Sequence, residues 1–192
     1  MRVSKQQMAE NRERILDAAA QLFREKGFDG IGVADLMKAA GMTHGGFYGH
    51  FASKEDLMAH AVERSMEGGR ALAEQLAAGA AGRPGGALAA VADWYLSCRH
   101  RDEMGEGCAV AALGADAARQ GPGVRQAITR GIRSFTERLA RLVPGGTEAE
   151  RRQKALATYA TLVGALVLAR AADDDALSRE VLEAARAALP AA

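Results

Sequence analysis

Apolar residues recur along this chain at intervals of three and four positions, which is the spacing of one face of an α-helix. In one segment they fall at Ile128, Ile132, Phe135, Leu139 and Leu142. No segment shows the strict alternation that indicates a half-buried strand. We therefore predict an all-α fold of about nine helices, near residues 6–26, 33–40, 44–50, 54–78, 86–103, 107–120, 123–143, 148–171 and 175–189.

Glycine and proline clusters mark the ends of several of these helices. Breaks are expected at Pro84-Gly85-Gly86, at Gly121-Pro122-Gly123 and at Pro144-Gly145-Gly146. The sequences at 53–56 and 147–150 begin with Ser or Thr and carry an acidic residue three positions later. This is the spacing of a capping box, so both sites predict the start of a helix.

Composition narrows the class of protein. The chain is 48% hydrophobic with a net charge of +1, which argues against disorder, and its two cysteines cannot staple a protein of 192 residues. The longest apolar run, 155–169, is shorter than the roughly 20 residues that span a bilayer. We expect a soluble, cytoplasmic protein with no membrane partner. No nucleophile–base pair, phosphate-cradling glycine loop or carboxylate pair is evident, so a helical enzyme is disfavoured and no cofactor is expected.

The second and third predicted helices are short and lie on either side of a tight turn. Residues 33–40 are followed by Gly41-Met42-Thr43 and then by 44–50. Two brief helices around a glycine-containing turn are typical of a helix-turn-helix, whose second helix lies in the major groove of DNA. A plain helical hairpin has the same spacing, so the spacing alone leaves both interpretations open.

Residues 27–57 resemble the TetR family of bacterial transcriptional regulators. The most specific part is Phe-Tyr-Gly-His-Phe at 47–51, followed by Ser-Lys-Glu-Asp-Leu at 53–57. The resemblance implies a helix-turn-helix DNA-binding domain at 1–53 and a helical ligand-binding and dimerisation domain at 54–192. It further implies a homodimeric repressor that binds a palindromic double-stranded DNA operator and is released by a small-molecule effector. Residues 107–114 are similar to a branch that includes electrophile-responsive repressors.

The resemblance, carried over by position, assigns DNA contact to Thr43, His44, Gly45, Tyr48, Gly49, His50 and Lys54. Thr43 is a good N-cap, so the free N–H groups and the dipole of the following helix can face a phosphate. The Tyr48 hydroxyl can donate to a phosphate, and Lys54 supplies a cation. Phe47 and Phe51, four positions apart, are assigned to the core.

Three glycines weaken this recognition helix. Gly45, Gly46 and Gly49 each lower helix stability by roughly 0.5–1 kcal/mol relative to alanine. Glycine also removes side chains that would read bases, so backbone approach and DNA shape carry more of the specificity. Residues 1–54 hold eight Lys+Arg against six Asp+Glu. We expect this weak basic balance to be supplemented by Arg2 and Lys5.

The last two helices are predicted to form a dimer interface. The segment 148–171 is apolar nearly all round and must be covered on every face, and 175–189 adds a second apolar stripe. Two such helices from each subunit would form a four-helix interface, whereas the alternative is the core of a monomer. The predicted interface consists of Tyr159, Leu162, Val163, Leu166, Val167, Leu177, Val181, Leu182 and Leu189.

The bulky and sulfur-containing residues of the second domain are candidates for an apolar effector pocket, although each is equally explained by core packing. They are Trp94, Tyr95, Cys98, Met104, Cys108, Phe135 and Tyr159. Cys108 begins a predicted helix, where the dipole favours a reactive thiolate, so it is either a sensor or a small buried hydrophobe. Cys98 is a candidate disulfide partner. The spacing of His100, Glu103, Glu106 and Cys108 fits no standard ligand pattern, so no metal site is predicted. A DNA-binding protein with no effector remains an alternative.

Overall fold

The computed structural model describes residues 4–80, 82 and 86–190, and over these residues the chain is helical with no strand. The predicted all-α fold is confirmed. Arg2, Pro84 and Gly85, which carried expectations above, lie outside the described residues. The elements are α1 (Lys5–Lys26), α2 (Val33–Ala39), the 3-10 helix η1 (His44–Gly49), α3 (Lys54–Gly79), α4 (Gly86–Tyr95), α5 (Cys98–Asp102), the 3-10 helix η2 (Met104–Glu106), α6 (Ala109–Ala117), α7 (Pro122–Leu142), α8 (Glu148–Ala171) and α9 (Asp175–Ala187).

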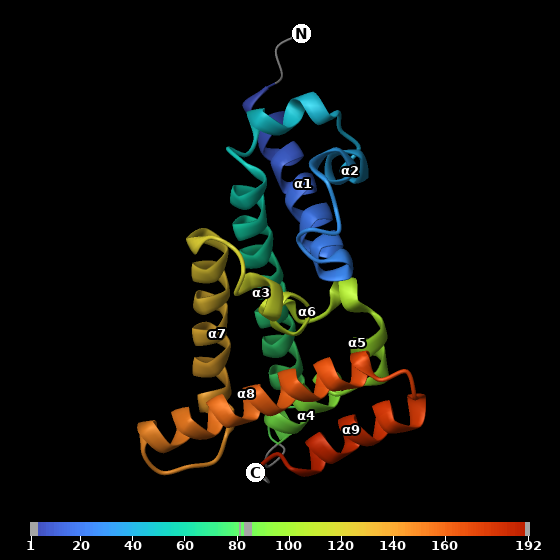
Figure 1. Ribbon diagram of the computed structural model, residues 1–192. Coiled ribbons are helices and arrows are strands. Elements are labelled where there is room, and N and C mark those ends of the chain that lie inside the picture. The colour runs from blue at the N-terminus through green and yellow to red at the C-terminus, as the bar shows by residue number, and fades with distance from the viewer. Residues whose placement is uncertain (1–3, 81, 83–85, 191–192) are drawn as a thin grey trace.

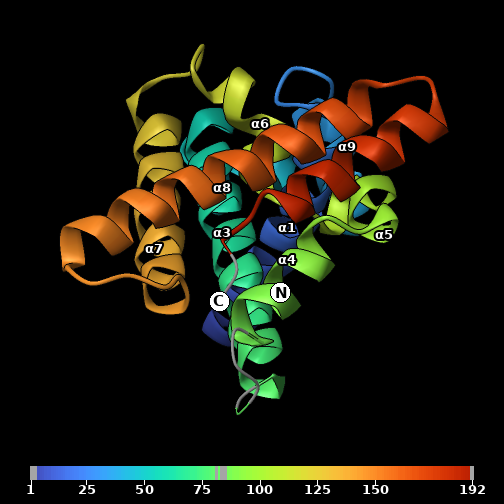
Figure 2. The ribbon, with the colours of Figure 1, turned by 90° about the horizontal axis from the view of Figure 1, so that it is seen from below.

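The helices form two connected parts. α1, α2 and η1 lie together at one end of the molecule, and α3 runs from that end toward the other, with α7 beside it (Figure 1). Seen from below, α8 and α9 run side by side across the far end (Figure 2). The DNA-facing candidates and the predicted dimer helices therefore lie at opposite ends.

The first hydrophobic core crosses the boundary predicted at residue 53. It contains Phe23 and Phe47 from the N-terminal helices, continues into α3 at Leu57, and reaches α6 and α7 at Leu113 and Val124. Residue 53 is the N-cap of α3 and so marks the start of a helix, but it marks no gap in packing. The part made of α1, α2 and η1, called the reading end below, is thus joined to the rest of the chain by one continuous hydrophobic core.

Several predicted helix bounds were wrong in ways that matter for the site. The helix expected at 86–103 is broken at Leu96–Ser97, because the Ser97 side chain accepts a hydrogen bond from the backbone N–H of His100 and starts α5. The helix expected from residue 107 begins only at Ala109 and follows the separate 3-10 turn η2. The capping box at Thr147–Glu150 is confirmed, with both reciprocal bonds present.

Helix α8 is the one described helix long and apolar enough to cross a membrane by length and composition. It is instead a core helix on one side, since Leu162 and Leu166 are fully buried between it and its neighbours. Its other side carries Leu156, Val167 and Leu168, which are 44%, 43% and 61% exposed. The helix therefore has a buried face and an uncovered apolar face.

Candidate DNA-reading end and effector cavity

The turn before η1 places the candidate DNA-reading residues. Gly41 has a φ of +73°, a conformation that L side chains rarely adopt, and lets the chain reverse after α2. Residues 44–49 then form a 3-10 helix and not the expected α-helix, with Gly46 N–H bonded to the Thr43 carbonyl at 3.1 Å. Three glycines in six positions account for this short, weak element.

Two aromatic anchors hold η1 in place. Phe47 and Phe51 are 1% and 2% exposed, as predicted, and their rings stack with centroids 5.9 Å apart. Arg12 of α1 lies 4.3 Å over the Phe51 ring and donates to the His50 carbonyl at 2.9 Å. The position of η1 is therefore set by packing against α2 and by the contacts of Arg12 from α1 with the residues that follow η1.

The proposed contact residues mostly face outward. Tyr48 is 74% exposed, while Thr43, His44, Gly45 and Gly49 are also exposed and His50 is half-buried. The Thr43 side chain makes no capping hydrogen bond, contrary to expectation. Thr43, Gly45, Gly49 and His50 line a surface hollow, and Asn11 and Lys38 line it as well. The sequence pattern did not single out these last two residues because they lie on other helices.

Lys54 has a structural partner that the sequence did not predict. Its Nζ donates to the backbone carbonyl of Phe28 at 2.6 Å. This bond ties the first turn of α3 to the loop after α1, so Lys54 positions the reading end as well as carrying charge. An ammonium group has three donors, so two remain for a phosphate.

Five of the predicted pocket residues line one narrow cavity of about 40 Å³: Trp94, Tyr95, Cys108, Phe135 and Tyr159. Cys98 and Met104 were assigned to this pocket wrongly, since neither lines it. The break at Ser97 and the turn η2 carry them away from the cavity, and Met104 is 38% exposed. Both cysteines are free thiols, so the candidate disulfide does not form.

His100 joins the two chain segments that border this cavity. Its Nε2 accepts from the backbone N–H of Cys108 at 2.9 Å, so the proton lies on Nδ1, which donates to the Tyr95 carbonyl at 2.7 Å. Burial is the main cause that lowers the pKa of His100 to about 4; the hydrogen bond to the Tyr95 carbonyl opposes this shift and nearby Arg170 adds to it. The imidazole is therefore neutral at physiological pH. Within the described residues no group of three His, Cys, Asp or Glu side chains is placed to hold a metal.

Two phenols and a thiol are among the polar groups that line the cavity. The Cys108 Sγ lies 3.9 Å from the Tyr159 hydroxyl, and Cys108 is the N-cap of α6. Burial raises the pKa of both Tyr95 and Tyr159 well above the usual range, so both hydroxyls stay protonated. The Tyr95 hydroxyl is buried and has no hydrogen-bond partner among the described residues.

The predicted dimer residues divide into two groups. Four of them are no more than 5% exposed and belong to the subunit's own core: Tyr159, Leu162, Leu166 and Leu182. These four side chains are therefore not available for contact with a second subunit. Val167 and Leu177 are exposed, and Val163, Val181 and Leu189 are half-buried. The uncovered part of the α8–α9 layer is therefore narrower than predicted.

Comparison with known proteins accounts for both parts of the chain. A family model described as bacterial regulatory proteins of the tetR family matches residues 15–61, and one described as a tetracyclin repressor-like C-terminal domain matches residues 84–185. The chain belongs to the TetR family. It is accordingly a DNA-binding transcriptional regulator and not an enzyme.

Individual TetR-family relatives support this in sequence and structure. The repressor NemR of Escherichia coli is 27% identical over 170 residues, covering 84% of both chains. The regulator AcrR of Shigella flexneri is 41% identical over 64 residues, but the match covers only 33% of this chain and 30% of AcrR. The crystal structure of reduced E. coli NemR superposes with a TM-score of 0.78 at 26% identity, covering 95% of this chain and all of that one. A TetR regulator from Chloroflexus aurantiacus gives 0.76 at 28%, covering 96% and 94%.

Proposed function

We propose that this TetR-family regulator is a homodimeric repressor that binds a palindromic operator through η1 and is released by a small-molecule or electrophile effector. The observation that carries DNA reading by η1 is its division into anchored and free side chains. Phe47 is 1% exposed and Tyr48 is 74% exposed in the same short helix. A hydroxyl held outward on a fixed backbone is suited to bond a phosphate. The repressor assignment is supported by the similarity to NemR, which is named a repressor.

Selection of bound duplexes from a random DNA pool, at near-physiological salt, tests the operator. We expect enrichment of an inverted repeat whose half-sites lie about one helical turn, or a multiple of it, apart. Salt-sensitive binding without any enriched sequence would contradict sequence-specific reading by η1. A protein that reads DNA acts where the chromosome lies, so we place it in the cytoplasm, with no membrane partner.

The effector part of the proposal is supported by the cavity and by Cys108. The thiol is free, lines the cavity and belongs to the N-cap residue of α6. N-ethylmaleimide should release the operator from the wild-type protein and from Cys98→Ser, but not from Cys108→Ser. Because the chain has only two cysteines, this pair is a matched control. Equal release from both variants would exclude Cys108 as the sensor.

An effector-free DNA-binding protein is the second candidate. A narrow cavity of about 40 Å³, with room for only a few water molecules, favours it. Operator binding that no small molecule or thiol reagent alters would support this alternative, and the DNA-binding part of the proposal would stand.

A further inference from the structure

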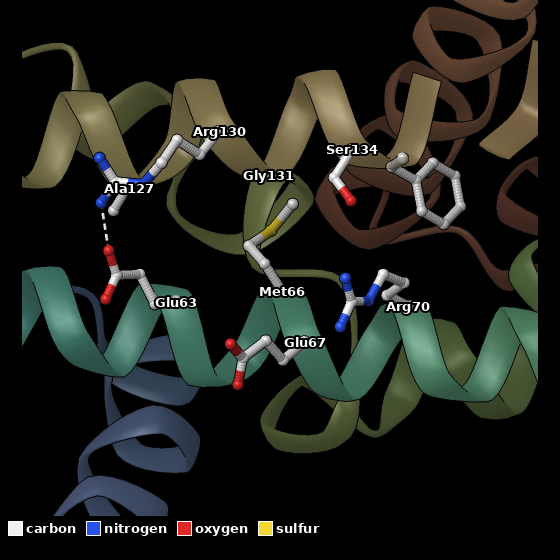
Figure 3. Close-up of a pocket in the computed structure, with 9 residues that line it drawn as sticks. Glu63, Met66, Glu67, Arg70, Ala127, Arg130, Gly131 and Ser134 are labelled. Carbon is white, nitrogen blue, oxygen red and sulfur yellow. Dashed lines mark hydrogen bonds and ion pairs between the residues drawn. The ribbon is translucent and has the colours of Figure 1, made fainter. Parts of the chain in front are cut away.

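The cavity lies next to a surface groove between α3 and α7. Figure 3 shows the residues that line the groove. The groove has a volume of about 360 Å³ and is bordered by charged and polar side chains, including Glu63, Arg70 and Ser134. Met66 of α3 and Phe135 of α7 line both the groove and the cavity. These two side chains therefore border the cavity on one side and the open groove on the other.

Met66 is the movable half of this wall. A Cβ placed at Gly131 would lie 2.6 Å from the Cγ and 3.0 Å from the Sδ of Met66, so the absence of a side chain at 131 creates the space that Met66 fills. Figure 3 shows Met66 reaching from α3 toward Gly131 on α7. Methionine is unbranched with three rotatable bonds, and Met66 is half-buried, so it can turn outward into the groove without unfolding either helix.

The cavity lining defines the ligand chemistry. It is almost wholly apolar, the one carboxylate that lines it is Glu106, and no Lys or Arg lines it among the described residues. Glu106 would repel an anion, and the apolar lining would not replace the hydration of a carboxylate, so the lining favours an uncharged molecule. Tyr95 is only 2% exposed, and its hydroxyl has no hydrogen-bond partner among the described residues. An unpaired buried hydroxyl is destabilising, so an acceptor placed beside it is favoured.

We propose that the cavity binds an uncharged, mainly apolar molecule with one hydrogen-bond acceptor, which enters between α3 and α7 as Met66 turns away from Gly131 and which accepts a hydrogen bond from the Tyr95 hydroxyl. This rests on the effector response proposed above. With a volume of about 40 Å³, the cavity alone is too small for a molecule that contains a six-membered ring. The cavity and the groove together reach the few hundred Å³ typical of ligand sites. Displacement of Met66 is thus part of binding.

Three six-membered-ring probes test the ligand class by calorimetry on the full chain. Cyclohexanone carries the acceptor, methylenecyclohexane is its isostere without one, and cyclohexanecarboxylate is charged. We expect Tyr95→Phe to weaken cyclohexanone binding by about 5- to 10-fold and to leave methylenecyclohexane binding unchanged. We expect no binding of the carboxylate. Equal effects of Tyr95→Phe on both neutral probes, tightest binding of the carboxylate, or binding of none of the three would each overturn the ligand class.

The route is tested by the rate of cyclohexanone binding, followed through the fluorescence of Trp94, which lines the cavity and is the only tryptophan of the chain. Met66→Ala should raise the association rate constant several-fold. Met104→Ala, which removes a methionine that lines neither the cavity nor the groove, is the matched control and should leave the rate unchanged. Equal rates in the two variants would overturn the route.

The operator assay separates this proposal from the proposed function. If the protein selects an inverted repeat but none of the probes binds as expected, the ligand class fails and the regulator stands. If probes bind as expected but neither they nor thiol reagents release the operator, the site stands and the effector response fails. Tyr95→Phe removes only an unpartnered hydroxyl, so its thermal midpoint should match or exceed that of the wild type.

Discussion

Individual side chains at the reading end have two kinds of task. Phe47 and Phe51 are buried and hold η1 in the core. Tyr48 points outward, and its hydroxyl has no hydrogen-bond partner within the described residues. Lys54 does both, because it bonds the Phe28 carbonyl and retains two donors. A phosphate contact and an internal tie are distinguishable, since only the first responds to salt.

Tyr48→Phe and Lys54→Ala should both weaken DNA binding on every sequence, by about 1 kcal/mol for a lost phosphate hydrogen bond. Lys54→Ala should also reduce the slope of log affinity against log salt by about one. Arg152→Ala, which removes one exposed cation from α8, is the control for net charge and should leave the slope unchanged. Fluorescence anisotropy at several salt concentrations gives both values, and unchanged affinity in Tyr48→Phe and Lys54→Ala would remove these contacts.

The neutral His100 makes stability depend on pH. Its pKa is lowered from the ordinary 6.5 to about 4 by burial, so below pH 6.5 the unfolded chain binds the proton first. Stability due to this group is complete above pH 6.5 and falls as the pH drops toward 4, by about 2 kcal/mol at pH 5. Urea unfolding at pH 7 and pH 5 measures this. His100→Gln should flatten the difference, and His60→Gln should leave it in place. An undiminished difference in His100→Gln would contradict the assignment.

At the scale of elements, the sequence predicted which segments are helical but not how they end. The long amphipathic helices follow directly from apolar spacing. The turn at 41–43 and the aromatic residues at 47–51 correctly located the helix-turn-helix. The break at Ser97 was missed because apolar spacing continues across it, and only the capping bond to His100 shows that α5 starts anew. For the same reason Cys98 and Met104 were placed in a cavity that they do not line.

Two glycines of similar appearance in the sequence have opposite roles in their helices. A Cβ at Gly68, in the middle of α3, would meet nothing within 4 Å, whereas one at Gly131 would collide with Met66. Gly68→Ala should therefore raise the free energy of unfolding by about 0.5–1 kcal/mol. Gly131→Ala should lower it, and adding Met66→Ala should relieve that clash. Urea unfolding of the four proteins checks this, and a stabilised Gly131→Ala would show that Met66 does not occupy that space.

Arg24 is the main polar link between α1 and the segment that precedes Cys108. Its Nε donates to the Gly105 carbonyl at 2.7 Å, and its other nitrogens bond the same carbonyl and the Ser65 hydroxyl. Arg24→Ala should lower the free energy of unfolding by about 1–3 kcal/mol, because these buried acceptors lose their donor. Lys26→Ala, on the exposed end of the same helix, should change it by less than about 0.5 kcal/mol. Equal losses would indicate that the bonds contribute little.

At the scale of the whole molecule, the far end presents an uncovered apolar layer. Leu156, Val167 and Leu168 of α8 and Leu177 of α9 are each between 43% and 61% exposed. Four large apolar side chains on two adjacent helices are suited to a self-complementary contact around a two-fold axis. The sequence indicated these helices but not which face is free, because a helix apolar nearly all round has no marked side.

Leu168→Glu and Leu177→Glu should each convert the proposed dimer to a monomer, because a carboxylate would be buried at the proposed interface without a partner. Light scattering coupled to size-exclusion chromatography measures the mass directly. Ala115→Glu, on the exposed side of α6, is the control and should remain dimeric. Operator affinity should fall together with the dimer, and a dimer that survives both substitutions would place the interface elsewhere.

The length of α3 has a mechanical consequence. Leu76 lines the cavity and Lys54 begins the same helix at the reading end, so at 1.5 Å per residue the two are about 33 Å apart. A tilt of about 5° about the cavity end displaces Lys54 by about 3 Å, which is the whole length of a hydrogen bond. The helix is thus a lever with a large gain. If an effector acts through this cavity as proposed, a small tilt of α3 there would move Lys54 far enough to break a hydrogen bond to a phosphate.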